Sequence, residues 1–565
     1  MACPVFDDGV PLAVLYRLQR FFDSVLFDTH DHKREKARMA NWYYYDDNGQ
    51  KHGPVRGRQL KSLARQGIIT AETFLETEEG QVILAGKAAG LNFTEAVLPK
   101  PPPLAEVNPF ATVLPGADDP HILPMSEPQL STMNSFQKSR MRVKSKISCP
   151  HCWHEFSTDQ ILFVSESPDL LGDIKLGDIE QMRFLPHRFD LDGAALDLRE
   201  IPCHKLACPN CHLKIPRSLL GTSNLFISIA GAPASGKSYF FTSMVWQLRK
   251  TMTQYFCMTF TDADPEMNKR IREYEMMQFL GGDDPNKPVA IEKTDVQGDI
   301  YNNTLIDGNL TSLAQPFSFT ITPLPSHPFP QYTEQVSQTV CMYDNAGESF
   351  LPGVDHLAQP VTRHLLASDV ILFLFDPTQD VRFKAACKIP VDDPQMDSSS
   401  TADVRRSKVN QCTVLTEMIT RIKTHSRLMA SEKIKTPLII VLTKLDAWLQ
   451  LVDFPNFYHP WYSTQDSPLH IYNAPQVEQS SQILRKLLLD LIPDLVGTAE
   501  GHATNVVYTA VSATGTAPEL GEPDQDGKRS LLYRPINLKP IWVTVPFFHA
   551  QFVAKKYCVP IHKEK

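Results

Sequence analysis

From residue 222 onward, short apolar runs alternate with stretches of helical periodicity. The runs are rich in β-branched and aromatic residues, which predicts buried strands. They cover residues 225–230, 339–343, 370–375, 437–442 and 506–511. Strands that alternate with helical segments are typical of a parallel sheet with helices on both faces. Residues 222–555 are therefore predicted to form a doubly wound α/β domain.

The segments between these strands give further expectations. Residues 265–280 have a helical pattern, whereas 283–315 is polar and is expected to be irregular. In residues 317–321, phenylalanine and isoleucine alternate with serine and threonine, which predicts a half-exposed edge strand. Residues 381–410 contain Asp-Pro and a serine cluster, and we expect a disordered or mobile insertion there.

Residues 1–38 differ from the rest of the chain. A short amphipathic helix is predicted over residues 12–26, and a polar, charged stretch follows it. Because an aromatic strand pattern begins just after Met39, we expect Met39 to be the natural start and residues 1–38 to be an extension or a disordered lead. The alternative is an amphipathic attachment to a membrane, which Asp23 and Asp28 beside the basic residues disfavour.

Residues 39–98 are predicted to form a small α+β domain. Trp42-Tyr-Tyr-Tyr45 is a strand-forming run, and Asp46-Asp-Asn-Gly49 is a hairpin turn signal. A helical face and a second β-rich stretch follow. The helical face comprises Leu60, Leu63 and Ala64.

This order of elements resembles the bacterial version of the GYF domain. The resemblance rests on the Trp42-Tyr-Tyr run, Gly53-Pro54-Val55 and Gly67-Ile68, although the Gly-Tyr-Phe triplet of eukaryotic members is missing. It implies an adaptor whose aromatic surface takes proline-rich peptides. Alternatively, Trp42 and the tyrosines are simply the core of the domain.

Residues 99–146 lose all periodicity. Prolines recur from Pro99 onward among serine, asparagine and glutamine. Because such a segment cannot bury enough apolar surface to fold, an extended linker with polyproline II character is expected. It serves as a plain spacer or as a ligand of the GYF-like domain in the same chain.

Composition limits the classes of function. The chain is 42% apolar and 21% charged with a net charge of −8, which argues against nucleic acid as the main partner. No apolar run is long enough to span a bilayer, and the first residues lack a signal-peptide layout. We therefore expect a cytoplasmic protein.

Two CxxC pairs lie within residues 147–218 and predict a structural zinc site. Cys149-Pro-His-Cys152 and Cys208-Pro-Asn-Cys211 can each present two thiolates to one tetrahedral Zn²⁺. The intervening residues 173–200 are then an insertion in a zinc ribbon. Nearby alternative ligands keep the exact set open; they are His151, Cys203, His204 and His212.

The sequence Gly231-x-x-x-x-Gly236-Lys237-Ser238 follows the first strand and precedes a helix, which is the context of a phosphate-binding P-loop. Backbone N–H groups through Ala234 and Ser235, together with the helix N-terminus, can bind triphosphate oxygens. The two glycines permit close approach, the lysine bridges the terminal phosphates, and the serine can coordinate Mg²⁺.

Further motifs stand at later strand ends and resemble the series found in P-loop GTPases of the translation-factor and Ras-like class. Asp344-Asn-Ala-Gly347 occupies the DxxG position. The resemblance implies that Asp344 holds Mg²⁺ through water and that the Gly347 N–H senses the γ-phosphate.

The same resemblance assigns guanine recognition to the next two strand ends. Thr443-Lys444-Leu445-Asp446 stands where the family has Asn-Lys-x-Asp, and Ser512-Ala513 follows the last strand. A carboxylate at Asp446 matches the N1–H and N2–H donors of guanine, a pair that adenine lacks. Lys444 would lie across the base, and the backbone at residues 512–513 would face the guanine carbonyl.

Four departures or gaps qualify this assignment. Thr443 replaces the usual asparagine, and Glu348 stands where Ras-like proteins place a water-orienting glutamine. Glu348 either holds that water, giving slow turnover, or is a surface charge. Asp376 is read as a helix cap rather than a site residue. The switch threonine cannot be chosen from its three candidates, Thr261, Thr294 and Thr304.

The sequence thus predicts a GTP-binding protein, a slow GTPase acting as a switch, with GTP, Mg²⁺ and Zn²⁺ as cofactors. Protein partners would bind through the GYF-like domain and the zinc ribbon. The alternative is an ATP-binding P-loop protein, or a scaffold that does not hydrolyse nucleotide and in which the TKxD match is coincidental.

Overall fold

The structure, a computed structural model, describes residues 41–45, 51–65, 69, 73–77, 82–85, 122–123, 144–191, 193–280, 284, 286–289, 301–330, 333–344, 361–387, 410–454, 459–464, 467–523 and 529–562. The chain divides into two units, residues 1–106 and 107–565, which are described separately. The predictions for residues 1–38 lie outside the described residues.

The first unit contains a four-stranded antiparallel sheet and one helix. Its elements are β1 (Asn41–Tyr45), β2 (Lys51–Arg56), α2 (Gly57–Arg65), β3 (Phe74–Thr77) and β4 (Val82–Leu84), with strand order β2-β1-β3-β4. Leu60 and Ala64 on α2 are buried against Leu75, which confirms the predicted helical face. The side chain of Trp42 lies outside the described residues.

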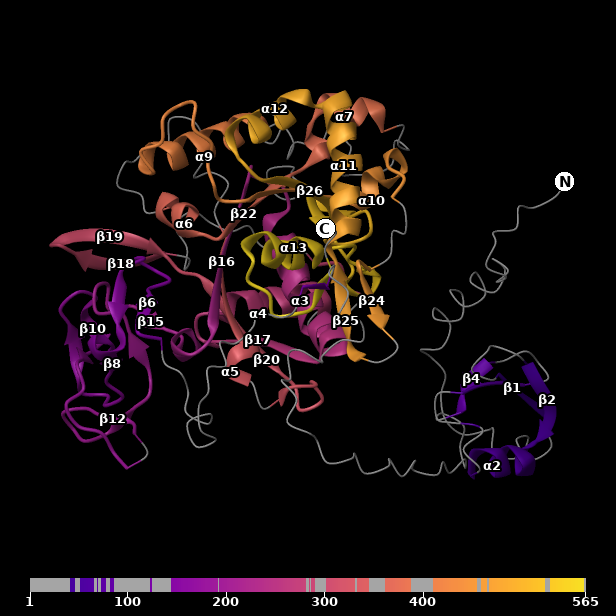
Figure 1. Cartoon of the computed structure of the whole chain (residues 1–565), viewed down its shortest axis with the longest axis horizontal. Helices are drawn as coiled ribbons and strands as arrows, with labels where there is room; N and C mark the ends of the chain where they lie inside the picture. Colours follow the sequence, from indigo (N-terminus) through magenta and orange to yellow (C-terminus); the bar gives the residue numbers. More distant parts are fainter. Residues whose placement is uncertain are drawn as a thin grey trace. The chain divides into compact units, whose positions relative to one another are not determined.

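A seven-stranded sheet forms the centre of the second unit (Figure 1). Its strands are β16 (Ser223–Gly231), β17 (Met258–Asp262), β20 (Phe317–Pro323), β21 (Gln338–Asp344), β22 (Val370–Phe375), β23 (Leu438–Leu442) and β26 (Val506–Ala510), in the order β17-β20-β21-β16-β22-β23-β26. The five strands from β21 to β26 are parallel, and β20 and β17 are antiparallel to their neighbours. The prediction of β20 as a half-exposed edge strand is wrong, because β17 covers its outer side and Ser318 is fully buried.

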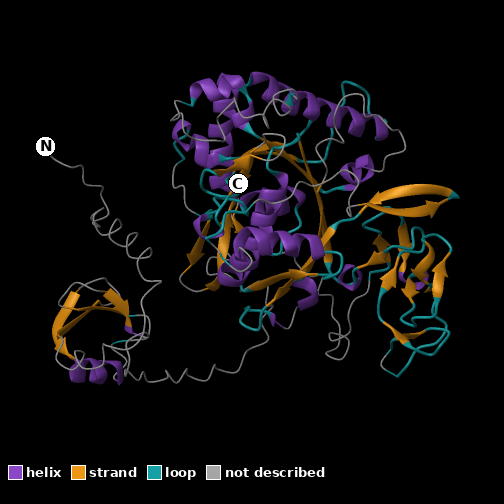
Figure 2. Cartoon of the chain, turned by 180° about the vertical axis from the view of Figure 1, so that it is seen from behind, coloured by secondary structure: helices purple, strands orange, loops and turns teal. Residues whose placement is uncertain are grey.

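Helices pack on both faces of this sheet (Figure 2). They are α3 (Lys237–Phe256), α4 (Lys269–Glu275), α5 (Thr333–Val336), α6 (Val361–Ala367), α7 (Val381–Ala386), α9 (Gln411–His425), α10 (Leu445–Trp448), α11 (Ala474–Leu491), α12 (Pro493–His502) and α13 (Val545–Ala554). The predicted helix over 265–280 is α4 followed by a π-helical turn, Met276–Leu280. Residues 381–386 are helical, contrary to the insertion predicted over 381–410, and residues 388–409 lie outside the described part.

Alternate residues of the buried strands face two separate cores. Ile227 and Ile229 of β16 point to the core that contains α3 and α13, whereas Ile371 and Phe373 of β22 point to the core that contains α9 and α12. Helix α11 contributes to both, with Val477 in the first core and its later turns in the second. Strand β26 is the last strand of the sheet, and α11 lies against its outer edge, where the Ser481 hydroxyl accepts a hydrogen bond from the Tyr508 N–H.

A β-hairpin occupies part of the region that was predicted to be irregular. Strands β18 (Tyr301–Ile306) and β19 (Asn309–Ala314) pair antiparallel around Asp307 and Gly308. Both turn residues have positive φ angles, 51° and 77°, as a tight two-residue hairpin turn requires. The Asp-Gly pair was a turn signal that the prediction for 283–315 overlooked.

The cysteine-rich part of the chain is built from short strands. They are β6 (Lys146–Ser148), β7 (Glu155–Ser157), β8 (Leu162–Val164), β9 (Leu171–Asp173), β10 (Gly177–Gln181), β11 (Arg183–Phe184), β12 (Ala195–Leu196), β13 (Pro202–Cys203), β14 (Leu206–Ala207) and β15 (Lys214–Ile215). We call residues 144–221 the cysteine module. It packs beside β16 and the β18–β19 hairpin (Figure 1).

A second sheet of the same unit joins the linker to the end of the chain. Strands β24 (Trp461–Thr464), β25 (Ser467–Asn473), β29 (Ile561–His562) and β5 (Ile122–Leu123) lie in the order β24-β25-β29-β5. Strand β5 belongs to residues 99–146, which were predicted to be an extended linker, and β29 lies beyond residue 555. The β27–β28 hairpin (Glu519–Pro523 and Arg529–Leu532) completes the unit.

In the described part of the chain, every helix is too short or too polar to cross a lipid bilayer.

Candidate functional site

The loop predicted to bind phosphate lies at the carboxyl end of β16, between β16 and α3. After β16 the chain builds β17, β20 and β21 on one side of it, and then β22, β23 and β26 on the other. The order of the strands therefore reverses between β16 and β22. In open α/β sheets, ligands bind in the crevice outside the strand ends at such a reversal.

The backbone of this loop needs its glycines. Gly231 has a φ of 153°, and a Cβ atom added there would lie 2.6 Å from the carbonyl oxygen of Leu374 in β22. Gly236 has a φ of 86° at the N-cap of α3, and Ala234 also has a positive φ. The loop thus approaches β22 closely and turns its backbone towards the start of α3.

Lys237 folds back over this loop. Its Nζ donates hydrogen bonds to the carbonyl oxygens of Gly231 (3.0 Å) and Ala232 (2.9 Å), and the side chain is buried. A buried ammonium group held at the centre of a backbone loop is suited to anion binding. Ser238 follows it in the first turn of α3 and is half-buried.

Asp344 ends β21, the neighbour of β16, and is paired with Ile229 in the register of the two strands. Burial raises the pKa of its carboxyl group to about 6, while nearby Lys237 opposes the rise. Its Oδ1 atom is buried without a hydrogen-bond partner among the described residues. A buried oxygen of this kind suits a cation or a cation-bound water. Gly347 and Glu348, the next predicted site residues, lie outside the described residues.

The TKxD segment is joined directly to the phosphate loop. The Thr443 hydroxyl donates a hydrogen bond to the carbonyl oxygen of Ser235 at 3.1 Å. The Thr443 N–H donates a hydrogen bond to the carbonyl oxygen of Phe375 at 2.9 Å. The carbonyl of Thr443 in turn accepts from the indole of Trp448 at 2.8 Å. Threonine therefore supplies a brace between the two loops, at the position where the sequence departs from asparagine.

Lys444 is oriented by a carboxylate that sequence reasoning treated only as a cap. Its Nζ lies 2.7 Å from Oδ2 of Asp376, a side chain with no exposed surface. Asp376 does cap the following turn, because Oδ1 accepts from the Thr378 N–H at 3.0 Å. The same carboxylate accepts from Nε2 of Gln379 at 3.0 Å, and that Nε2 also donates to the carbonyl of Ala234. Asp376 and Gln379 thus connect Lys444 to the phosphate loop.

Asp446 and the segment after β26 also meet. The Ser512 hydroxyl donates to Oδ1 of Asp446 at 2.5 Å and accepts from the Gly515 N–H at 2.7 Å. The carbonyl of Ala513 accepts from the hydroxyl of Ser243 on α3 at 2.7 Å. The described site residues after β21, β22, β23 and β26 therefore lie with the phosphate loop at the carboxyl ends of the parallel strands.

The two candidate switch threonines in the described part of the chain, Thr261 and Thr304, do not join this group. Thr261 lies in β17, and the Thr304 hydroxyl is buried and donates to the carbonyl of Cys211 at 2.8 Å. Thr294 lies outside the described residues.

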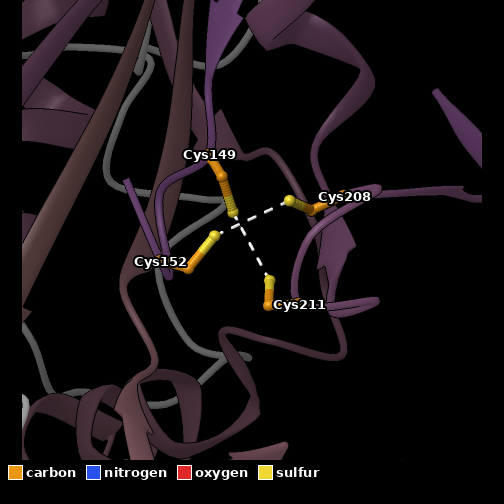
Figure 3. Close-up of side chains that lie close together, drawn as sticks. All are labelled: Cys149, Cys152, Cys208 and Cys211. Atoms are coloured by element: carbon orange, nitrogen blue, oxygen red, sulfur yellow. Dashed lines mark hydrogen bonds between the residues drawn. The ribbon is translucent and has the colours of Figure 1, made fainter. Parts of the chain in front are cut away.

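A second site is formed by the four cysteines of the two CxxC pairs, which point towards one another (Figure 3). Their sulfur atoms all lie within 4.8 Å of one another, and the Cys149–Cys211 and Cys152–Cys208 pairs are both separated by 3.7 Å. Four sulfurs at about 2.3 Å from a central Zn²⁺ would be about 3.8 Å apart in a tetrahedron. The cluster therefore has the dimensions of a Cys₄ metal site.

Electrostatics and hydrogen bonds also fit a cation here. Burial raises the pKa of the Cys149 thiol, because a negatively charged thiolate is unfavourable away from water. Four thiolates buried together therefore need a compensating positive charge. Backbone N–H groups of His151 and Asn210 point at the sulfurs of Cys149 (3.4 Å) and Cys208 (3.3 Å). Such N–H groups orient thiolate ligands.

The alternative ligands lie elsewhere. Nε2 of His151 forms a hydrogen bond with the carbonyl oxygen of Lys214 at 2.9 Å. Nδ1 of His212 forms one with a carboxylate oxygen of Asp173 at 2.8 Å. Cys203 lies 3.7 Å from a carboxylate oxygen of Asp197.

The cysteine module covers one face of β16 and β21. Trp153, which follows the first CxxC pair, packs edge-on against Phe226 of β16 at a ring separation of 4.8 Å. It also contacts Tyr343 of β21 at 5.6 Å. Tyr343 is the residue before Asp344, so the two candidate sites share a strand.

Comparison with known proteins identifies one domain. Residues 42–80 match the family model described as GYF domain 2, a protein-interaction domain, in the first unit. No curated protein matches the chain.

Three solved structures each match about half of this chain. Translation elongation factor SelB from Methanococcus maripaludis, in complex with the GTP analogue GppNHp, is 9% identical with a TM-score of 0.17, over 52% of this chain and 31% of that one. The G domain of the T. maritima FeoB iron transporter is 9% identical with a TM-score of 0.18, and the match covers 51% of this chain and 88% of the FeoB chain. Sup35 complexed with GDP is 12% identical with a TM-score of 0.18, and the match covers 52% of this chain and 38% of the Sup35 chain. The chain thus spans about a third of the length of SelB, and scores this low do not establish a shared ligand.

Proposed function

We propose that this chain is a GTP-binding protein that acts as a slow GTPase switch, with its nucleotide site in a doubly wound P-loop domain. The observation that carries the proposal is the hydrogen bond from the Thr443 hydroxyl to the Ser235 carbonyl. It joins a segment suited to reading a base to a loop suited to binding phosphate. Because Ser512 positions Asp446 in that segment, the segment can contact the base of a nucleotide whose phosphates occupy the loop.

The phosphates would be bound by the backbone N–H groups of residues 231–238 and by Lys237. Ser238 and Asp344 would hold Mg²⁺, which supplies charge neutralisation of the phosphates when it is bound. The Oδ1 atom of Asp344, which is buried and has no hydrogen-bond partner among the described residues, supports this role. Gly347 and Glu348 follow as the candidate γ-phosphate sensor and water-orienting group.

The base would be read by Asp446, whose carboxylate is positioned by Ser512. Its two oxygens can accept the N1–H and N2–H of guanine together, whereas adenine lacks that pair of donors. The backbone of Ser512-Ala513 would face the guanine carbonyl, and Lys444 would lie across the base.

The other two parts would serve recognition. The cysteine module would be a zinc ribbon in which Cys149, Cys152, Cys208 and Cys211 hold one structural Zn²⁺. The GYF-type domain would bind protein partners, with proline-rich peptides as the first class to test.

Binding of fluorescent GTP, ATP and GDP by the full chain tests the nucleotide assignment. We expect GTP and GDP to bind in the presence of Mg²⁺ at least tenfold more tightly than ATP. A preference for ATP, or no binding of either triphosphate, would reject the GTP switch. Metal analysis of the purified protein should find about one zinc ion per chain, and a folded, metal-free protein would reject the ribbon.

A further inference from the structure

The part of the cysteine module between its two CxxC pairs exposes an unusual number of large apolar side chains. They include Leu171, Ile174, Ile179, Phe189, Leu191 and Leu198. Ile174, Ile179 and Leu191 are 81%, 88% and 107% exposed, so they pack on nothing within the described chain. Soluble proteins seldom gather such side chains in one short segment unless something binds there.

This segment is held together by polar anchors instead of by those apolar side chains. Asp173 accepts hydrogen bonds from the backbone of Lys175 and Leu176 and pairs with His212. Asp197 accepts from the hydroxyl of Ser165 at 2.8 Å and from two backbone N–H groups. Asp173, Asp197, Ala194 and Ala195 are the buried residues of this segment, whereas its outward apolar side chains contribute little to its packing because most of their surface is exposed.

A groove lies in the same module, at the side of β8 and β14. It has a volume of about 350 Å³. Ile161 and Leu206 are buried at its floor, whereas Leu185 and Phe189 stand at its rim with 44% and 55% exposure. Apolar pockets with exposed apolar rims are typical of sites that receive anchor side chains from a partner.

The charge around this surface indicates what kind of partner would bind. Among the described residues between 158 and 201 whose side chains are not buried, acidic residues outnumber basic ones: Asp159, Glu166, Asp169, Asp178, Glu180, Asp190 and Glu200, against Lys175, Arg183, Arg188 and Arg199. Asp159 and Arg217 both line the groove, so the excess of acidic residues lies around it. Complementary charge steers association and disfavours partners of like charge.

We propose that this groove and the apolar residues of 171–201 form a docking surface for a basic, amphipathic segment of another protein. Apolar side chains of the segment enter the groove between Leu185 and Phe189, and its lysine or arginine residues face the surrounding carboxylates. Strands β10 and β12 lie on the side of the module that faces away from the seven-stranded sheet (Figure 1), and the exposed parts of Leu185 and Phe189 leave the groove open to solvent. The proposal does not depend on which nucleotide binds.

Fluorescence anisotropy of the full chain with three synthetic 12-residue peptides tests this surface. The first alternates leucine with lysine, the second leucine with glutamate, and the third serine with lysine. We expect the leucine–lysine peptide to bind at least tenfold more tightly than either of the others. Equal binding of all three peptides would overturn the proposal.

Variants locate the binding. The double variant Leu185→Ser with Phe189→Ser should bind the leucine–lysine peptide at least tenfold more weakly, because both side chains stand at the groove rim. The matched control is Met429→Ser, which removes an apolar side chain that is 73% exposed between α9 and β23. Circular dichroism and melting temperature should be unchanged in both variants, because the replaced side chains are exposed. Equal peptide affinity in the rim variant and the control would reject the groove. Sedimentation that shows a wild-type dimer and a monomeric rim variant would assign the surface to a second copy of this chain instead.

Discussion

The hydroxyl of Tyr343 donates a hydrogen bond to the carbonyl oxygen of Pro150 at 2.5 Å, deep between β21 and the first CxxC turn. Tyr343 is almost fully buried, and the next residue is Asp344. One end of this contact therefore belongs to the candidate zinc site and the other to the strand that carries the candidate Mg²⁺ ligand.

Tyr343→Phe tests whether that contact matters for nucleotide binding. The variant leaves a buried carbonyl without its donor, which should lower the free energy of unfolding by about 1–3 kcal/mol. Because β21 would lose a restraint beside Asp344, Mg²⁺-dependent GDP affinity should also fall severalfold. Tyr472→Phe is the matched control, since its buried hydroxyl bonds to His549 in a different part of the core. The same GDP affinity in both variants would show that the module does not influence the site.

Asp446→Asn should change the preferred base. The amide replaces one acceptor with a donor, so guanine should bind at least tenfold more weakly, as expected for the loss of a charge-assisted pair of hydrogen bonds. Xanthine nucleotides should gain affinity relative to guanine nucleotides. Competition binding with GDP and XDP measures this, and Asp453→Asn on the exposed loop that follows serves as control. Unchanged GDP affinity in the Asp446 variant would eliminate the guanine assignment.

Asp376→Asn should weaken nucleotide binding without changing the base preference. Asparagine can still cap the next turn, but the Lys444 ammonium loses its buried counter-ion. We expect at least a tenfold loss in GDP affinity with the ratio of GDP to XDP affinity unchanged. Asp380→Asn, at the cap of α7, provides the comparison. A change in the base ratio would mean that Asp376 acts on the base itself.

Asp344 predicts a pH dependence. Its pKa is about 6 in the folded protein and 3.8 in the unfolded chain, so the folded state favours the protonated acid. Asp344 therefore contributes up to about 3 kcal/mol to the free energy of unfolding. This contribution is complete below pH 3.8 and is lost as the pH rises through 6. Mg²⁺ requires the carboxylate, so Mg²⁺ with GDP should raise the melting temperature more at pH 7.5 than at pH 5. Asp344→Asn should remove that difference, and an identical Mg²⁺ effect at both pH values would contradict it.

The strand ends could be predicted because parallel strands in the middle of a sheet are buried on both faces. They appear as continuous apolar runs, and the polar residues after Tyr343 and Leu442 mark where each run leaves the core. The four sulfurs could be grouped for a similar reason, since each CxxC turn fixes two of them.

What the sequence did not reveal depends on contacts between distant segments. Nothing in the run around Phe226 and Tyr343 distinguishes side chains that contact a helix from side chains that contact the cysteine module. The brace from Thr443 to Ser235 joins residues far apart in sequence, and the role of Asp376 beyond capping appears only once Lys444 lies beside it.

Helix α11 has a consequence for how the protein behaves at high concentration. The edge of a parallel sheet exposes unpaired N–H and C=O groups that can template another chain. Because α11 crosses that edge and the Ser481 hydroxyl accepts the Tyr508 N–H at 2.9 Å, part of β26 is already paired within its own molecule. A helix that contributes to two cores therefore also leaves fewer unpaired backbone groups at this edge for another chain to bind.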